Sequence, residues 1–235
     1  MLLILNILVA SILGRSSSAS PVNLVSRDHH RTDRDITTGP SRCPDFCAGT
    51  NATSDSNIYV CGDPRLGPWA IPTALPLTVI AGKVSNYHRF AGLCPGEFLA
   101  KYTAPETGLY VYPPFDGFQL SASGQPIKAD MELEPGLLLD RFGSEYGLFL
   151  GAAGAPYSER SLPPSNLNAM PNDPYPFNYH RYEVAKPFLV IAGPIAGAFG
   201  QQGLGTQFVV PETILSLVNG GFLTRLNLPR KSDRY

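Results

Sequence analysis

The stretch "LLLDRFGSEYGLFLGAAGAPYSERSLPP", residues 137–164, places two arginines in unusual surroundings. Arg141 follows an apolar run and precedes Phe-Gly, and Arg160 comes just before Leu-Pro-Pro. Between them, "YGLFLG" (146–151) is a short aromatic run punctuated by glycine, which indicates a strand. Charged side chains usually lie on solvated faces, whereas these two sit beside residues that favour burial or a rigid backbone. We therefore expect the two guanidinium groups to hold an anionic ligand.

Short runs of the same kind continue on both sides of this stretch. They are bounded by Gly or Pro, and several are rich in aromatic or β-branched residues, which predicts strands. They cover residues 75–80, 108–113, 131–135, 180–184, 187–193 and 206–211. Two segments predict short helices instead: "CPGEFLAKY" (94–102), and "PETILSLVNGG" from about Pro211 to Gly220. The pattern predicts an α+β domain with a compact, β-rich core of short, mostly antiparallel strands.

Composition narrows the class of protein. The chain has 235 residues, 43% of them hydrophobic and 16% charged, which is enough for one globular domain with a sizeable core. A net charge of −1 gives no electrostatic footprint for nucleic acid or a membrane surface. The sequence contains no GxSxG, HExxH or GxxxxGK[ST] motif and no GxGxxG that opens a helix. The common hydrolase, zinc-protease and nucleotide-binding signatures are therefore absent.

The N-terminus predicts secretion. The apolar stretch from residue 2 to 13 is shorter than the roughly 20 residues of a membrane span, and a small-residue cleavage site follows at Ser17-Ser18-Ala19. We expect a signal peptide over 1–19, although no Lys or Arg precedes the apolar stretch and a buried first strand or helix is the alternative. Residues 20–42 are polar and lack periodicity, which predicts a flexible leader with solvated histidines at His29 and His30.

The cysteines agree with an extracellular protein. Their even number suits two disulfides that clamp an N-terminal segment over 43–74, ahead of a main domain over 75–235. They are Cys43, Cys47, Cys61 and Cys94. A zinc site is the alternative, but no CxxC pair is present, and three disulfide connectivities remain open. Asn51 begins an Asn-Ala-Thr sequon in a polar stretch that predicts an exposed, glycosylated loop.

Two further features have both a functional and a structural interpretation. The glycine-rich "GPIAGAFGQQGLGTQF" (193–208) would allow close approach to a ligand, and Gln207 lies where this loop becomes an apolar strand. Gln207 is either a ligand contact or an outward-facing strand residue. The alternating Asp130, Glu132 and Glu134 could supply a catalytic carboxylate pair, but this spacing more often marks a solvated strand face.

Four motifs in this order, "LLLDRFGSEYGLFL", "PYSERSLPP", "YHRYEV" and "GAFGQQGLGTQF", resemble the TNT domain. This is the family of the tuberculosis necrotizing toxin, which also includes secreted fungal NAD glycohydrolases of the conidial surface. The resemblance covers about residues 75–227, and the N-terminal features look like the fungal branch. It implies a β-rich core related to ADP-ribosylating toxins. It also implies cleavage of the nicotinamide–ribose bond of NAD, or NADP in some members, with NAD as substrate and no cofactor; some fungal members also bind calcium near the C-terminus.

The resemblance also assigns roles to residues. Arg141 and Arg160 would grip the pyrophosphate, because a guanidinium fork matches phosphate oxygens in bidentate fashion. Gln207 would form the catalytic centre with Arg141, contacting the reacting ribose or holding the attacking water. Phe142 would pack on the nicotinamide or its ribose.

Two more residues join the predicted substrate site. Tyr157 would shape the pocket wall, and His180 is either a substrate contact or a strand histidine satisfied by its neighbours. The apolar "ILSLVNGGFL" (214–223) is compatible with a homodimer, as found in the fungal branch, and equally with core burial. The tail "LPRKSDRY" (228–235) supplies few oxygen ligands, so we expect no calcium there.

The resulting expectation is a secreted NAD glycohydrolase, extracellular or on the cell or spore surface. Its partner is NAD or NADP, with neither nucleic acid nor membrane. An inert surface or adhesion module on the same fold is the main alternative. A glycosidase that uses the acidic strand at 130–134, or an ADP-ribosyltransferase with Glu145 as its catalytic glutamate, would need carboxylates placed at the site.

Overall fold

A computed structural model describes residues 42–169 and 175–228 of the chain. The predicted signal peptide, His29, His30, nearly all of the predicted leader and nearly all of the C-terminal tail lie outside these ranges. Within them, no helix is both long and apolar enough to cross a membrane.

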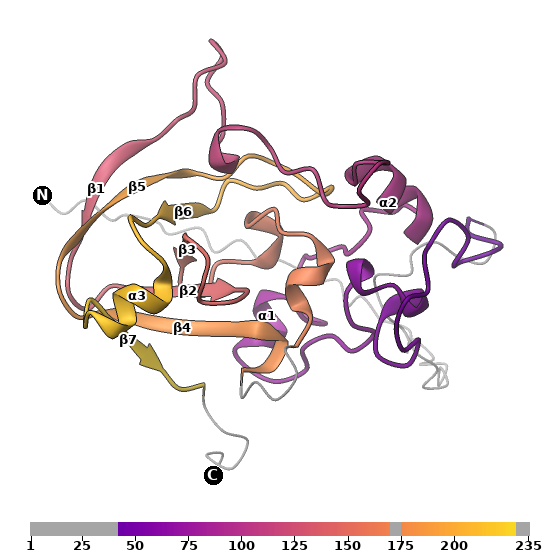
Figure 1. Ribbon diagram of the computed structural model, residues 1–235, viewed down its shortest axis with the longest axis horizontal. Helices are drawn as coiled ribbons and strands as arrows, with labels where there is room; N and C mark the ends of the chain where they lie inside the picture. The colour runs from indigo at the N-terminus through magenta and orange to yellow at the C-terminus, as the bar shows by residue number, and fades with distance from the viewer. Residues whose placement is uncertain (1–41, 170–174, 229–235) are drawn as a thin grey trace, which may run out of the picture. The chain divides into compact units, whose positions relative to one another are not determined.

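Seven strands form one sheet in which every pair of neighbours is antiparallel. They are β1 (Ala129–Leu133), β2 (Leu138–Phe142), β3 (Phe149–Ala152), β4 (Tyr179–Val184), β5 (Phe188–Pro194), β6 (Thr206–Val209) and β7 (Leu223–Leu226). Their order across the sheet is β1-β5-β6-β3-β2-β4-β7, with β1 and β5 running side by side in Figure 1. This architecture, with few helices, confirms the predicted α+β class.

The helices are short. They are α1 (Leu77–Ile80), α2 (Pro95–Tyr102) and α3 (Ile214–Asn219). Short 3-10 turns cover Val60–Gly62, Pro64–Leu66, Phe115–Gly117, Tyr157–Glu159, Pro164–Leu167 and Pro176–Asn178. The helix predicted at 94–102 is confirmed as α2. Helix α3 begins after the predicted Pro211, because the Thr213 side chain caps it by accepting from the Ser216 amide.

Two strand predictions are wrong. The run 75–80 forms helix α1, in which Leu77 and Ile80, three positions apart, are the buried residues. The run 108–113 joins no strand and makes only an isolated bridge between Tyr110 and Thr103. No prediction covered strands β2 and β7; β2 lies between β3 and β4, and β7 completes one edge of the sheet.

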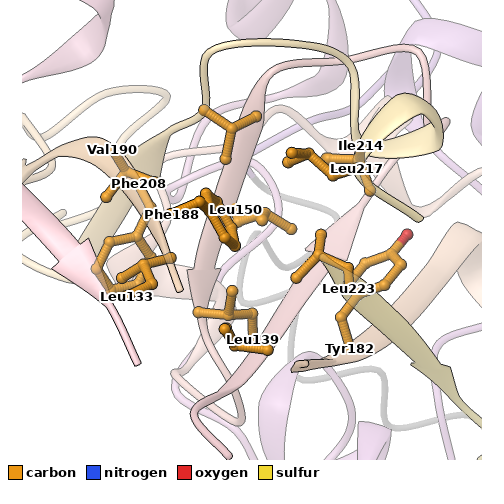
Figure 2. Packing of buried hydrophobic residues seen from close by; sticks show 12 residues of the cluster. Leu133, Leu139, Leu150, Tyr182, Phe188, Val190, Phe208, Ile214, Leu217 and Leu223 are labelled. Carbon is orange, nitrogen blue, oxygen red and sulfur yellow. The ribbon is translucent and has the colours of Figure 1, made fainter. Parts of the chain in front are cut away.

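The main core lies on one face of the sheet, where α3 also packs. Its buried cluster takes residues from all seven strands and from α3. Figure 2 shows these side chains pointing toward one another. Ile214, Leu217 and Leu223 are buried in this cluster, so the stretch 214–223 serves the core. The predicted homodimer therefore gains no support from this stretch.

The N-terminal segment is closed by two disulfides, Cys43–Cys94 and Cys47–Cys61, as their number predicted. The zinc alternative is therefore wrong. Val60 and Leu66 share a buried cluster with Phe98 of α2 and with Phe199 of the glycine-rich loop. Asn51 lies in a largely exposed loop, as expected for an acceptor of glycan. The boundary between 43–74 and 75–235, and the glycosylation itself, stay predictions.

Candidate active site

A cavity of about 570 Å³ opens beside the central strands β2, β3 and β6. It is lined by four residues predicted at the site, which the fold brings together from distant motifs. They are Arg141, Phe142, Arg160 and Gln207. The other two predicted residues, Tyr157 and His180, do not line it.

The sheet register explains why these side chains meet. Asp140 on β2 is the cross-strand neighbour of Gly151 on β3, and Gly151 is the neighbour of Gln207 on β6. Directly opposed residues present their side chains on the same face, so the three positions form a row across the sheet. A Cβ at Gly151 would lie only 2.8 Å from Nη1 of Arg160, so this glycine leaves room for the guanidinium.

Gln207 is held in a single orientation. Its side chain lines the cavity with a residue exposure of only 8%, so it is not the outward-facing strand residue of the alternative interpretation. Its Nε2 donates to the backbone oxygen of Asp116 over 2.8 Å. Because a carbonyl can only accept, this bond fixes the amide and directs Oε1 away from Asp116.

Arg141 is a cavity-lining cation without an acidic partner among the described residues. Its Nε donates to the carbonyl of Ser144 (2.8 Å) and its Nη1 to that of Phe149 (2.7 Å). A Cβ at Gly147 would lie 2.0 Å from Nη2, so this glycine makes space for the side chain. Burial lowers the pKa of Arg141, since the guanidinium loses hydration without gaining a carboxylate. An anionic ligand would supply the missing compensation.

Arg160 differs, because its fork is already bound. Its Nη1 and Nη2 donate to the two carboxylate oxygens of Asp140, at 2.5 and 2.9 Å, and its Nε donates to the Ala155 carbonyl. Arg160 is 7% exposed and Asp140 is 0% exposed. Asp140 also accepts from the Tyr179 hydroxyl and the Gly154 amide. The pyrophosphate contact of Arg160 stays a prediction. Because its guanidinium already binds Asp140, the structure gives Arg160 the role of a residue that positions its neighbours.

Aromatic packing supports the cavity wall at Phe142. The rings of Phe142 and Tyr157 meet edge to face with centroids 5.0 Å apart. The guanidinium carbon of Arg160 lies 5.3 Å from the Phe142 centroid. Tyr157 is fully buried and donates its hydroxyl to the Pro163 carbonyl over 2.8 Å. Tyr157 therefore acts on the site through Phe142 and does not contact the cavity.

His180 and Glu145 belong to a separate polar cluster. Glu145 accepts from the Tyr182 hydroxyl (2.8 Å) and from Nε of Arg225 (2.8 Å), and Nδ1 of His180 lies 3.9 Å from its carboxylate. Nε2 of His180 lies 3.1 Å from Oδ1 of Asn178. None of these residues lines the cavity. Glu145 is thus not placed as the catalytic glutamate of a transferase.

This cluster leads to a prediction about pH. Burial would raise the pKa of Glu145, but hydrogen bonds from Arg225 and Tyr182 outweigh it and hold the pKa below its usual range. The ionised carboxylate therefore stabilises the fold above the unfolded pKa of about 4.3, and this contribution is lost as pH falls through the folded pKa. We expect Glu145→Gln to lower the melting temperature by about 2–4 °C at pH 7. Thermal unfolding at pH 7 and pH 3 checks this. An equal difference between variant and parent at both pH values would contradict it.

The acidic strand and metal ligation contribute nothing to the cavity. Asp130, Glu132 and Glu134 are exposed and lie outside it, which confirms the solvated-face interpretation and leaves a glycosidase without its carboxylates. Across 42–169 and 175–228, no three His, Cys, Asp or Glu side chains are grouped to hold a metal. The tail assessed for calcium falls almost entirely outside those ranges.

The sequence argument missed the two acidic residues that line the cavity. Asp140 immediately precedes Arg141 in an otherwise apolar run, and an ionisable group in such a run signals a buried partner. Asp116 belongs to an Asp-Gly dipeptide that indicates a tight turn.

Known proteins resemble this chain over a region that includes the strands β2, β3 and β6 beside the cavity. The profile of the family described as Tuberculosis necrotizing toxin matches residues 132–226. The conidial surface nicotinamide adenine dinucleotide glycohydrolase nadA of Aspergillus fumigatus is 52% identical over 192 residues, which is 80% of this chain and 79% of that protein. The solved tuberculosis necrotizing toxin complexed with its immunity factor is 18% identical with a TM-score of 0.40, covering 91% of this chain and 100% of that one. Rhs1-CT in complex with its cognate immunity protein is 16% identical with a TM-score of 0.29, covering 44% and 80%.

Proposed function

This chain belongs to the family of the tuberculosis necrotizing toxin, and on that premise we propose that it is an NAD glycohydrolase that acts outside the cell or at its surface. The observation that carries the proposal is one cavity lined both by Arg141, which has no acidic partner within 42–169 and 175–228, and by the oriented amide of Gln207. Two disulfides suit an oxidising compartment. An inert surface module is not favoured, because the cavity keeps both the Arg141 guanidinium and the Gln207 amide.

The reaction converts NAD and water to nicotinamide, ADP-ribose and a proton. The C–N bond breaks with its electron pair moving to the pyridinium nitrogen, so nicotinamide leaves neutral and needs no general acid. Positive charge moves to the ribose, water adds at the anomeric carbon, and its proton passes to solvent. The protein has to orient the substrate and stabilise the moving charge. NAD is the substrate, and no cofactor is required.

Each cavity group has a part in this reaction. Arg141 binds the pyrophosphate with the edge of its guanidinium that carbonyls leave free. Oε1 of Gln207 accepts a hydrogen bond from the attacking water, because Nε2 is held by Asp116. Phe142 supplies an apolar wall for the nicotinamide end, and Arg160 holds that wall in place.

Nicotinamide release from NAD by the purified protein tests the function, and Arg141→Lys tests the binding assignment. Lysine keeps the charge but loses the planar fork, so we expect KM to rise and kcat/KM to fall about 10- to 100-fold. Arg181→Lys on β4 is the matched control, since Arg181 lies outside the cavity. Unchanged kinetics in Arg141→Lys would remove the pyrophosphate assignment, and no release by the folded parent would favour the inert module.

A further inference from the structure

The charged residues that line the cavity are not all paired with one another in the part of the chain that the structure describes. Two arginines and two aspartates line it, and Arg160 and Asp140 bind each other. Among the residues that the structure describes, this leaves one cation, Arg141, and one anion, Asp116, without an ionic partner. Asp116 is exposed, and its carboxylate forms no hydrogen bond or ion pair with any residue in the described ranges. The cavity therefore offers a free positive and a free negative group to a ligand.

The turn that carries Asp116 is unusual in its backbone. Phe115 and Asp116 have φ of +55° and +59°. Aspartate tolerates this left-handed region, whereas for a bulky residue such as Phe115 it costs on the order of 1–2 kcal/mol. The turn is nevertheless fixed, because its carbonyl at Asp116 accepts from Gln207. Strain kept at a cavity wall, and tied to the proposed catalytic amide, is evidence that the position of Asp116 matters to the site.

The two charged residues reach the cavity from different parts of the fold. Asp116 is bound to Gln207 of β6, while Arg141 lies on β2, and β3 separates these strands. A molecule with a positive ring at one end and a phosphate at the other would complement both groups.

We propose that Asp116 recognises the positive charge of the nicotinamide–ribose end of the substrate. This inference rests on the proposed function, and it adds Asp116 to Arg141 as a second charged residue that binds the substrate. The carboxylate attracts the pyridinium in the bound substrate and the cationic ribose in the transition state, and Arg141 takes the pyrophosphate. Asp116 thus sets the direction in which the dinucleotide lies and favours its oxidised, cationic form.

Asp116→Asn tests this with little change in structure, because asparagine has the same shape and also tolerates a positive φ. The bond to Gln207 is made by the backbone carbonyl and is retained. We expect kcat/KM for NAD to fall about 10- to 100-fold. The inhibition constant of NADH, whose reduced ring is uncharged, should change less than about twofold, since the charge interaction is absent there. The preference for the oxidised form over the reduced one therefore falls.

Controls separate the outcomes. Asp130→Asn makes the same change on exposed β1, outside the cavity, and should leave both constants unchanged. Asp116→Gly, which also accepts a positive φ, replaces Asp116→Asn if that variant does not fold. The inference is overturned if Asp116→Asn weakens kcat/KM for NAD and the binding of NADH equally, or if it changes neither. Both outcomes leave the proposed function intact. A folded parent that releases no nicotinamide overturns the proposed function itself.

Discussion

Asp140→Ala is expected to lower the free energy of unfolding by about 3–5 kcal/mol, because it leaves a buried arginine without its counter-charge. Asp140 is 0% exposed and accepts bonds from Arg160, Tyr179 and Gly154. In a domain of this size the loss corresponds to a fall in melting temperature of roughly 6–20 °C. Urea and thermal unfolding measure both quantities. Asp130→Ala, an exposed aspartate on β1, should cost less than about 0.5 kcal/mol.

A double variant separates pairing from general disruption. Arg160→Ala alone leaves the Asp140 carboxylate buried and unpaired, so it should cost about as much as Asp140→Ala. Removing both charges should then cost clearly less than the sum of the two single changes. Additive costs would show that the two residues are not coupled. A folded Arg160→Lys variant that raises KM as much as Arg141→Lys would instead support the pyrophosphate contact of Arg160.

Most strands could be predicted because their runs are short, apolar or aromatic, and bounded by Gly or Pro. The error at 75–80 arose because a short apolar run fits both a strand and one turn of helix, and only burial of Leu77 and Ile80 decides between them. At 108–113, Tyr110 is anchored by its hydroxyl to the Arg65 carbonyl instead of by a strand ladder. Such long-range anchors leave no periodic signal.

Four of the six residues predicted for the site line the cavity, but the sequence did not indicate which of them pair with other residues. In the sequence Arg141 and Arg160 look equivalent, since each stands beside apolar or rigid residues. What separates them is Asp140, which lies next to Arg141 in the chain but binds Arg160, 20 positions away. Neighbouring residues of a strand point to opposite faces of the sheet. Asp140 and Arg141 are adjacent in the sequence, and for that reason they do not pair with each other. Asp116 lies 91 positions from Gln207, and only the fold joins them.

Gln207→Ala is expected to lower kcat by about 10²–10³-fold, the usual effect of losing one oriented polar group at a reacting centre. KM should change little, because the proposed pyrophosphate contact of Arg141 is retained. Gln202→Ala is the matched control, since Gln202 is exposed in the preceding loop and lies outside the cavity. Nicotinamide release and circular dichroism of each variant provide the comparison. Full activity in a folded Gln207→Ala would move the catalytic centre elsewhere in the cavity.

Gln207→Glu asks whether the orientation of the amide matters or only its size. A glutamate has nearly the same shape, but its ionised oxygens cannot donate to the Asp116 carbonyl that Nε2 now binds. Two acceptors would face each other at 2.8 Å, so the side chain should turn away and the turn at 115–117 should lose its anchor. We expect kcat to fall as far as in Gln207→Ala. If Gln207→Glu stays active, a carboxylate can hold the water as well, and the bond to Asp116 is not what places the catalytic oxygen.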